Sequence, residues 1–245
     1  MWSIYDNLEA VKDRIARAAQ AAGRDPGGVT LVAVSKTHPA PLLAEARAAG
    51  QRMFGENYVQ EAVEKMDSLS GEENARPLEW HLVGPLQSNK TRVVAARFDW
   101  VHSVETQKVA RRLSEARLDS QPPLNVLIQV NVSGEASKSG VAPEAVAGLA
   151  RAISALPRIK LRGLMAIPEP GAGVDRYRAL KALFDQLAPL GVDTLSVGMS
   201  DDMDLAIAEG STLVRVGTAI FGARAPKDEA GACARGPRSA AKAGA

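Results

Sequence analysis

The feature that most constrains the fold of this chain is a regular alternation of short β-branched runs with longer amphipathic runs. An opening helix is predicted over Ile4–Ala22, where apolar residues recur every three or four positions until Gly23 and Pro26. Eight strands are predicted after it, over Thr30–Ser35, Arg52–Phe54, Glu79–Val83, Trp100–Ser103, Asn125–Asn131, Lys160–Met165, Thr194–Val197 and Thr212–Val216. Helical spacing fills the stretches between them, over Pro41–Ala49, Tyr58–Leu69, Asn89–Ala96, Thr106–Arg117, Pro143–Ala155, Asp175–Leu187 and Asp202–Glu209.

This alternation predicts an α/β fold with a parallel sheet. Continuous apolar runs such as Val126–Val130 are typical of strands that are buried on both faces. Eight repeats of strand and helix favour a single (β/α)8 barrel of the TIM type, with an extra N-terminal helix, over an open doubly wound sheet. A chain of 245 residues accommodates one such domain. We expect the barrel to occupy residues 1–224 and an Ala/Gly-rich, disordered tail to occupy residues 225–245.

Composition excludes several classes of protein. Hydrophobic residues make up 46% and charged residues 24% of the chain, which is typical of a globular domain and excludes a disordered or collagen-like one. No stretch approaches 18 uninterrupted apolar residues, and the first residues lack the basic start and apolar run of a signal peptide. We therefore expect a cytoplasmic protein that does not act at a membrane.

The net charge and the few cysteine and histidine residues exclude further classes of partner. The net charge of +2 comes from the tail, so the body of the protein is neutral, and with aromatic residues at only 4% we expect no nucleic-acid surface. The single cysteine, Cys233, lies in the tail, which excludes a disulfide framework or a thiolate metal cluster. His38, His81 and His102 lack the i, i+4 spacing of a helical metal pair, so no metal site is expected.

Polar residues gather where the predicted strands end. Lys36 directly follows the first strand, the seventh strand runs into Gly198–Asp202, and the eighth runs into Gly217–Gly222. In a barrel of this type the chemistry lies at the carboxyl ends of the strands, and phosphate groups bind after the seventh and eighth. Small residues there let backbone N–H groups approach an anion. The lysine and both loops are therefore predicted to face one mouth of the barrel.

A lysine beside a phosphate-binding loop supports two chemistries, charge binding and Schiff-base formation with an aldehyde. Pyridoxal 5′-phosphate offers both an aldehyde and a phosphate, and Arg215 on the eighth strand can approach its pyridine nitrogen. Because a guanidinium stays protonated, it only donates to that nitrogen, which leaves the pyridine uncharged and a poorer electron sink.

Several long motifs in a fixed order resemble the pyridoxal phosphate homeostasis proteins, which look like the barrel domain of bacterial alanine racemase standing alone. The resemblance covers about residues 2–224. The motifs that carry it are Val34–Thr37, Phe54–Glu61, Trp80–Lys90, Ser137–Gly140, Arg162–Pro168, Gly198–Met203 and Arg215–Gly222. At His38 this sequence departs from the family, in which many relatives have a second lysine.

The resemblance implies a single barrel that holds pyridoxal 5′-phosphate as an aldimine on Lys36, with the ring nitrogen near Arg215. It further implies a phosphate held around Ser200, Gly217 and Thr218, and a site lined by Asn57 and Met165.

Each of these residues also has a plain structural interpretation. Arg215 can pair with a core carboxylate such as Glu56, and Asn57 can cap the following helix. Lys138 is either a surface charge or a secondary, transient binding site for the cofactor. His81 is interpreted as a hydrogen-bonded strand histidine, and Asp201 and Asp202 as structural residues at the start of a helix.

The same residues favour a carrier over an enzyme. Alanine racemases use a second proton-transfer group, a tyrosine from an additional β domain of a partner subunit. We expect no such domain here. None of Tyr5, Tyr58 and Tyr177 has a sequence context suited to that function. We expect a monomer that stores the cofactor, keeps the free aldehyde low and delivers it to apoenzymes that depend on it. The alternatives are an amino acid racemase acting as an obligate dimer and a cofactor-free Schiff-base aldolase.

Overall fold

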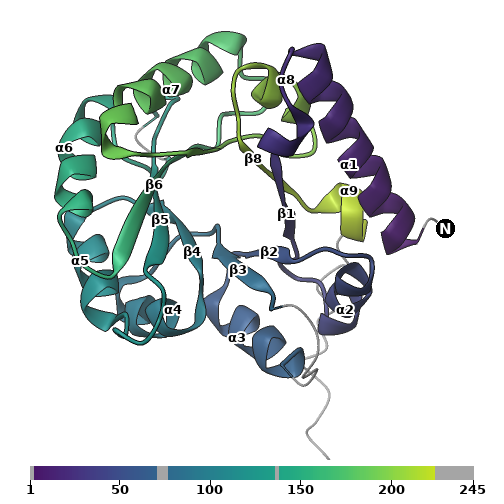
Figure 1. The fold of residues 1–245 in the computed structure, drawn as a ribbon, viewed down its shortest axis with the longest axis horizontal. Helices are drawn as coiled ribbons and strands as arrows, with labels where there is room; N and C mark the ends of the chain where they lie inside the picture. The colour runs from purple at the N-terminus through teal and green to yellow at the C-terminus, as the bar shows by residue number, and fades with distance from the viewer. Residues whose placement is uncertain (1–2, 71–76, 136–137, 224–245) are drawn as a thin grey trace, which may run out of the picture.

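The eight predicted strands form one closed, all-parallel barrel in chain order, with helices around its outside (Figure 1). The computed structural model describes residues 3–70, 77–135 and 138–223. The strands are β1 (Thr30–Val34), β2 (Met53–Glu56), β3 (Glu79–Leu82), β4 (Trp100–Val104), β5 (Leu124–Gln129), β6 (Ile159–Met165), β7 (Thr194–Ser196) and β8 (Leu213–Val216). The predicted (β/α)8 class is confirmed, while the tail with Cys233 lies outside the described residues.

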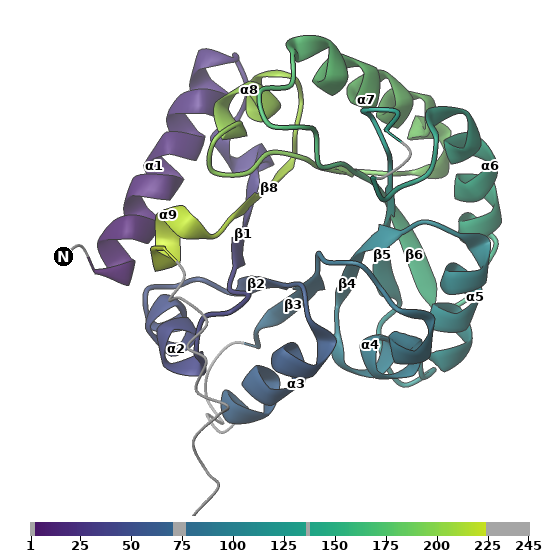
Figure 2. The same ribbon diagram turned by 180° about the vertical axis from the view of Figure 1, so that it is seen from behind.

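The helices alternate with the strands as predicted, and the view from behind shows the same ring (Figure 2). They are α1 (Ile4–Ala21), α2 (Ala40–Ala48), α3 (Val59–Ser68), α4 (Thr91–Arg97), α5 (Gln107–Ala116), α6 (Pro143–Ser154), α7 (Val174–Gln186), α8 (Met203–Ala208) and the short α9 (Thr218–Phe221). Three short 3-10 turns accompany them, over Pro26–Gly28, Ser88–Lys90 and Ala188–Leu190. No helix among residues 3–70, 77–135 and 138–223 has the length and apolar character needed to cross a membrane.

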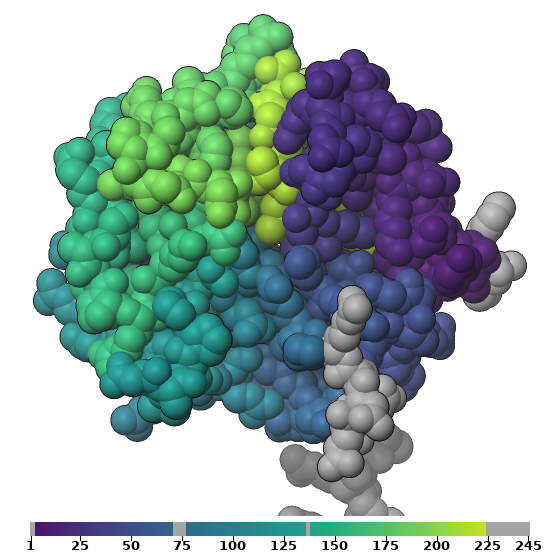
Figure 3. All heavy atoms as spheres, in the orientation of Figure 1, coloured from purple at the N-terminus to yellow at the C-terminus, as the bar shows by residue number. Residues whose placement is uncertain are grey.

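The sequence of the first helix explains both where the helix begins and which of its faces is buried. Ser3 and Asp6 form a reciprocal capping box at its start. Leu8, Val11 and Ile15 are buried on one face, which packs against α8 and α9. The space-filling view accordingly shows the purple first helix beside the yellow-green final part of the described chain (Figure 3).

Side chains of the strands divide between two apolar regions. In β5, Val126 and Ile128 belong to the main core, whereas Leu127 between them joins a separate cluster with Trp100 and Met165. Because successive side chains of a strand point to opposite faces, the main core lies between barrel and helices and the small cluster lies inside the barrel.

The second strand extends further than its sequence indicates. The predicted strand ends at Phe54, but Gly55 is paired on both sides, with Val34 of β1 and His81 of β3. A Cβ at Gly55 would lie 3.0 Å from a methyl group of Val32, so the close packing of neighbouring strands explains this glycine.

Closure of the barrel pairs the last strand with the first. β8 pairs with β1 along four residues, with Ala33 opposite Val216 at the last of them. The segments that follow these strands, which contain Lys36 and Gly217, are therefore neighbours although they are far apart in the sequence.

Candidate functional site

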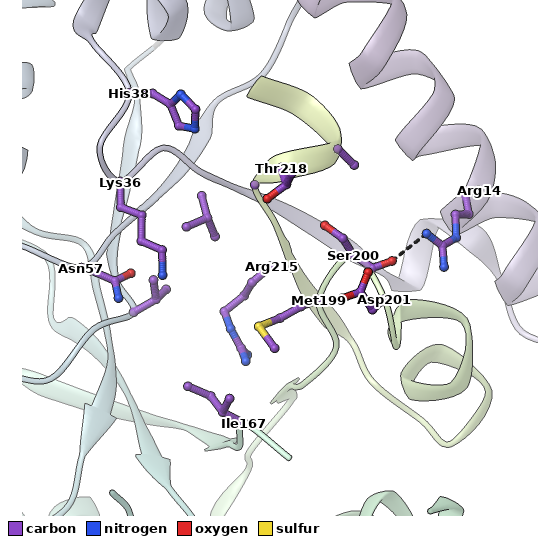
Figure 4. A pocket seen from close by; sticks show the side chains of 14 residues that line it. Arg14, Lys36, His38, Asn57, Ile167, Met199, Ser200, Asp201, Arg215 and Thr218 are labelled. Carbon is purple, nitrogen blue, oxygen red and sulfur yellow. Dashed lines mark hydrogen bonds between the residues drawn. The ribbon is translucent and has the colours of Figure 1, made fainter. Parts of the chain in front are cut away.

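A cavity of about 590 Å³ opens at the carboxyl ends of the strands, a size typical of small-molecule sites (Figure 4). Six of the seven residues predicted to form the site lie on its wall, namely Lys36, Asn57, Ser200, Arg215, Gly217 and Thr218. The remaining lining residues are Arg14, Val34, Val83, Ile167, Met199, Asp201, Ala219 and His38. The exposed side chains of Ile167 and Met199 supply apolar surface at its rim.

Lys36 extends from the end of β1 into this cavity, and its side chain lies near those of Asn57 and Arg215 (Figure 4). The next residue, Thr37, has a φ of 66°, which is unusual for a β-branched residue. Such strain persists only where surrounding contacts hold the backbone in place.

Lys65 provides those contacts. Its buried ammonium donates to the carbonyl oxygen of Ser35 at 2.7 Å and to the carboxylates of Glu56 and Glu61 at 2.7 and 2.6 Å. Glu61 also accepts from the backbone N–H of Thr37 at 2.6 Å. The residues on either side of Lys36 are thus bound to one buried cation and its partner carboxylate, which positions the lysine backbone.

Arg215 enters the cavity from β8. It donates through Nη1 to the carbonyl oxygen of Ser196 at 2.8 Å and to its hydroxyl at 2.6 Å, and through Nη2 to the carbonyl oxygen of Ala166 at 3.0 Å. Burial lowers the pKa of Arg215 to about 10, and the charge of Asp202 opposes that shift. The guanidinium therefore remains a cation and a pure hydrogen-bond donor at neutral pH. It does not form the predicted alternative pair with Glu56, which instead binds Lys65 and Ser35.

The loop after β7 is held from three sides. Arg14 of α1 donates to the carbonyl oxygen of Ser200 at 2.7 Å, the bond that Figure 4 marks, and it pairs with Asp204 at 2.9 Å. Asp202 accepts from the backbone N–H of Met199 at 2.6 Å and from the hydroxyl of Tyr177 at 2.7 Å. The structural interpretation of Asp202 agrees with these contacts, whereas its neighbour Asp201 lies on the cavity wall.

Two glycines let the loops after β7 and β8 pack closely against neighbouring elements. Gly198 has a φ of 103°, and a Cβ there would lie 2.6 Å from that of Ala206. At Gly217 a Cβ would lie 2.9 Å from the carbonyl oxygen of Val34. Gly217 directly precedes α9, and the first N–H groups of a helix have no acceptor within it. Together these glycines bring the loops after β7 and β8 to the cavity that Lys36 and Arg215 also line.

Comparisons with known proteins agree with this arrangement. Residues 7–225 match the family model described as alanine racemase, N-terminal domain. A pyridoxal phosphate homeostasis protein of Pseudomonas aeruginosa is 57% identical over 227 residues, which cover 91% of this chain and 97% of that protein. The chain belongs to the family of pyridoxal phosphate homeostasis proteins.

Solved structures support the same assignment. PipY of Synechococcus elongatus, with pyridoxal phosphate bound, is 38% identical, covers 85% of this chain and 100% of its own, and superposes with a TM-score of 0.73. Alanine racemase of Corynebacterium glutamicum, at 21% identity, covers 89% of this chain and 61% of its own with a TM-score of 0.62, and shares the fold.

One residue that the homeostasis-protein motifs place on the site lies elsewhere. Met165 ends β6 but is fully buried, and it packs inside the barrel with Trp100 and Leu127 rather than on the cavity wall. Lys138 lines an adjoining cavity that shares Asn57 and Ile167 with the main one, and it pairs with Glu135 at 2.9 Å.

Arg14 is a residue of the cavity wall that the sequence did not predict. It lies on the polar face of an amphipathic helix, where a charged residue is the usual occupant, so no local signal distinguishes it. Ile167 and Met199 were contained in the quoted motifs, but an apolar residue in a loop gave no reason to place it on the wall.

Proposed function

We propose that this chain binds pyridoxal 5′-phosphate covalently through Lys36 and serves in intracellular homeostasis and delivery of this cofactor, without robust catalysis of its own. One observation carries the proposal: a single cavity brings a lysine, a buried arginine and two glycine-containing loops together at the carboxyl end of the barrel. The homeostasis proteins to which the chain is related, and the PipY structure with bound pyridoxal phosphate, support it.

Each part of the cofactor has a matching group. Of the residues that line the cavity, Lys36 would meet the aldehyde carbon, Arg215 would donate to the ring nitrogen, and Ser200, Gly217 and Thr218 would hold the phosphate. Asn57 completes the wall beside the lysine. When bound, the cofactor supplies an electrophilic carbonyl and a conjugated ring, and donation from a protonated arginine leaves that ring a weak electron sink.

The tyrosines argue for a carrier rather than a racemase. Tyr5 and Tyr58 are exposed, and neither is among the lining residues of the cavity. Tyr177 donates its hydroxyl to Asp202, and burial together with this bond raises its pKa, so it is unsuited to exchange a proton near neutral pH. In the described part of the chain, no tyrosine therefore stands opposite Lys36.

The test is an absorbance spectrum of the protein mixed with pyridoxal phosphate, followed by borohydride reduction and mapping of the pyridoxyl adduct. The wild type and a Lys90→Ala control should show the Schiff-base band and an adduct on Lys36, and Lys36→Ala should lose that adduct. An adduct on Lys138 in the wild type would show that the lysine was wrongly assigned. A chiral assay that finds amino acid racemisation at about 1–1,000 per second would refute the carrier function.

The proposed carrier is a cytoplasmic monomer that transfers the cofactor to apoenzymes through transient contacts. A measurement of its mass in solution tests whether the protein is a monomer.

Transfer is tested by comparing two arrangements of the loaded protein and an apoenzyme, one with a dialysis membrane between them and one with direct contact. The apoenzyme should be activated faster in direct contact. Equal rates in both arrangements would show release to solvent only.

A further inference from the structure

A row of polar side chains, buried except for Glu79 at its far end, crosses the interior of the barrel from Arg215. Nη1 of Arg215 lies 2.6 Å from Oγ of Ser196, which lies 3.0 Å from Nδ1 of His102. Nε2 of His102 lies 2.9 Å from Nδ1 of His81, and Nε2 of His81 lies 3.3 Å from Oε1 of Glu79. Ser196, His102 and His81 are at most 1% exposed.

The row links the two ends of the barrel. Glu79 and His81 line a second cavity of about 470 Å³, whose other walls come from the first residues of the strands, such as Thr30, Thr194 and Leu213. That cavity is therefore at the amino-terminal mouth, opposite the mouth that holds Lys36.

The Arg215 end determines the direction of every hydrogen bond in the row. A guanidinium only donates, so Ser196 Oγ accepts from it. Within the described part of the chain, the only other partner of this hydroxyl is Nδ1 of His102, so the hydroxyl hydrogen must be donated there. Nδ1 of His102 then carries no proton, and its Nε2–H donates to Nδ1 of His81.

The Glu79 end is compatible with this direction. Nε2 of His81 lies 3.3 Å from Oε1 of Glu79 without forming a hydrogen bond, and a proton on Nε2 suits the neighbouring carboxylate, which only accepts. Nδ1 of His81 is the acceptor of the bond that His102 donates from Nε2. The three hydrogen bonds from Arg215 to His81 therefore share one orientation, which assigns one tautomer to each of the two buried histidines.

We propose that Ser196 and His102 are positioning residues that fix Arg215 for the ring nitrogen of the cofactor, an inference that rests on the proposed function. Ser196 takes both hydrogens of Nη1 and Ala166 takes one of Nη2. Nε–H and the second Nη2 hydrogen remain to donate into the cavity that Arg215 lines. His102 acts one step further away, because its unprotonated Nδ1 holds the serine hydroxyl in the orientation that accepts from Arg215.

The tautomers can be measured on the protein without any cofactor. Nitrogen-15 spectra of the imidazoles should show His102 and His81 neutral and protonated on Nε2. A proton on Nδ1 of either ring would overturn the proposal, whatever the protein binds.

The positioning function is tested by titration with pyridoxal phosphate. Ser196→Ala should weaken binding about tenfold and shift the absorbance band of the bound form, while the adduct stays on Lys36. Ser211→Ala removes an equally buried hydroxyl outside the row and should bind as the wild type does, and Ser196→Thr should restore most of the affinity. Wild-type affinity and spectrum in Ser196→Ala would overturn the proposal.

A readout on the wild type keeps the test decisive should Ser196→Ala fail to fold. Binding of pyridoxal phosphate should shift the His102 nitrogen signals, because Arg215 gains a new acceptor, whereas inorganic phosphate should leave them unchanged. Unchanged signals with a mapped Lys36 adduct would refute the row but leave the carrier function intact, and the absence of any adduct would refute the carrier function itself.

Discussion

Nζ of Lys65 lies 2.7 Å from Oε1 of Glu56, and both side chains are almost completely buried. Burial raises the pKa of Glu56, and the charge and hydrogen bond of Lys65 oppose that shift. A charge pair in such surroundings is costly to break, because removal of one partner leaves the other buried and uncompensated.

Replacement of Lys65 by methionine should therefore destabilise the fold by about 3–5 kcal/mol and weaken binding at Lys36. Urea unfolding followed by circular dichroism measures the loss. The double variant Lys65→Met, Glu56→Leu removes both charges and should lose less than the single variant. A single variant as stable as the wild type would show that the pair does not support the strand end.

Arg14 should support phosphate binding because it holds the loop of Ser200, although the two residues are far apart in the sequence. Arg14→Gln loses the charged bond to the carbonyl of Ser200 and should raise the dissociation constant for pyridoxal phosphate about tenfold, measured by absorbance titration. Asp204→Asn disturbs only the ion pair and is the matched control. Equal losses in both variants would assign the effect to the ion pair instead.

Gly217→Ala should separate the loop after β8 from the end of β1. The added methyl group would lie 2.9 Å from the carbonyl oxygen of Val34, so we expect a loss of about 1–3 kcal/mol and weaker cofactor binding. Gly28→Ala meets no atom within 4 Å and serves as control. The expectation fails if the two variants have the same melting temperature and affinity.

Acid should destabilise the protein through His102, whose pKa burial lowers well below 6.5. Between that lowered pKa and 6.5, the unfolded chain binds a proton that the folded chain does not, so the free energy of unfolding falls as pH falls. The slope for one group is at most about 1.4 kcal/mol per pH unit. Urea unfolding at about pH 7.5 and 5.5 measures it, and His102→Gln should flatten it. Titration of the His102 signals with a midpoint near 6.5 in the folded protein would contradict this.

Sequence patterns predicted the fold and the mouth of the barrel at which Lys36 lies, because both follow from local order, whereas Asn57 and Thr218 were assigned to the candidate site through the family resemblance. The repeated strands and helices specify a barrel, and in a barrel Lys36 and Gly217 necessarily meet at one mouth. Arg14 could not be predicted in this way, since its contact with Ser200 depends on how α1 docks. The face occupied by Met165 likewise depends on strand register.

The short α9 was missed because four residues that include a threonine give no helical period. The row from Glu79 to Arg215 was missed for a related reason. Its members come from four strands, and each reads alone as an ordinary polar residue in a buried run.

The pairing of β8 with β1 also determines when the site can exist during synthesis. Lys36 leaves the ribosome early, but the loop with Gly217 follows the last strand, so the wall of the cavity is incomplete until nearly all of the barrel has emerged. A nascent chain therefore displays Lys36 before it has the loop after β8 that forms the facing wall of the finished cavity.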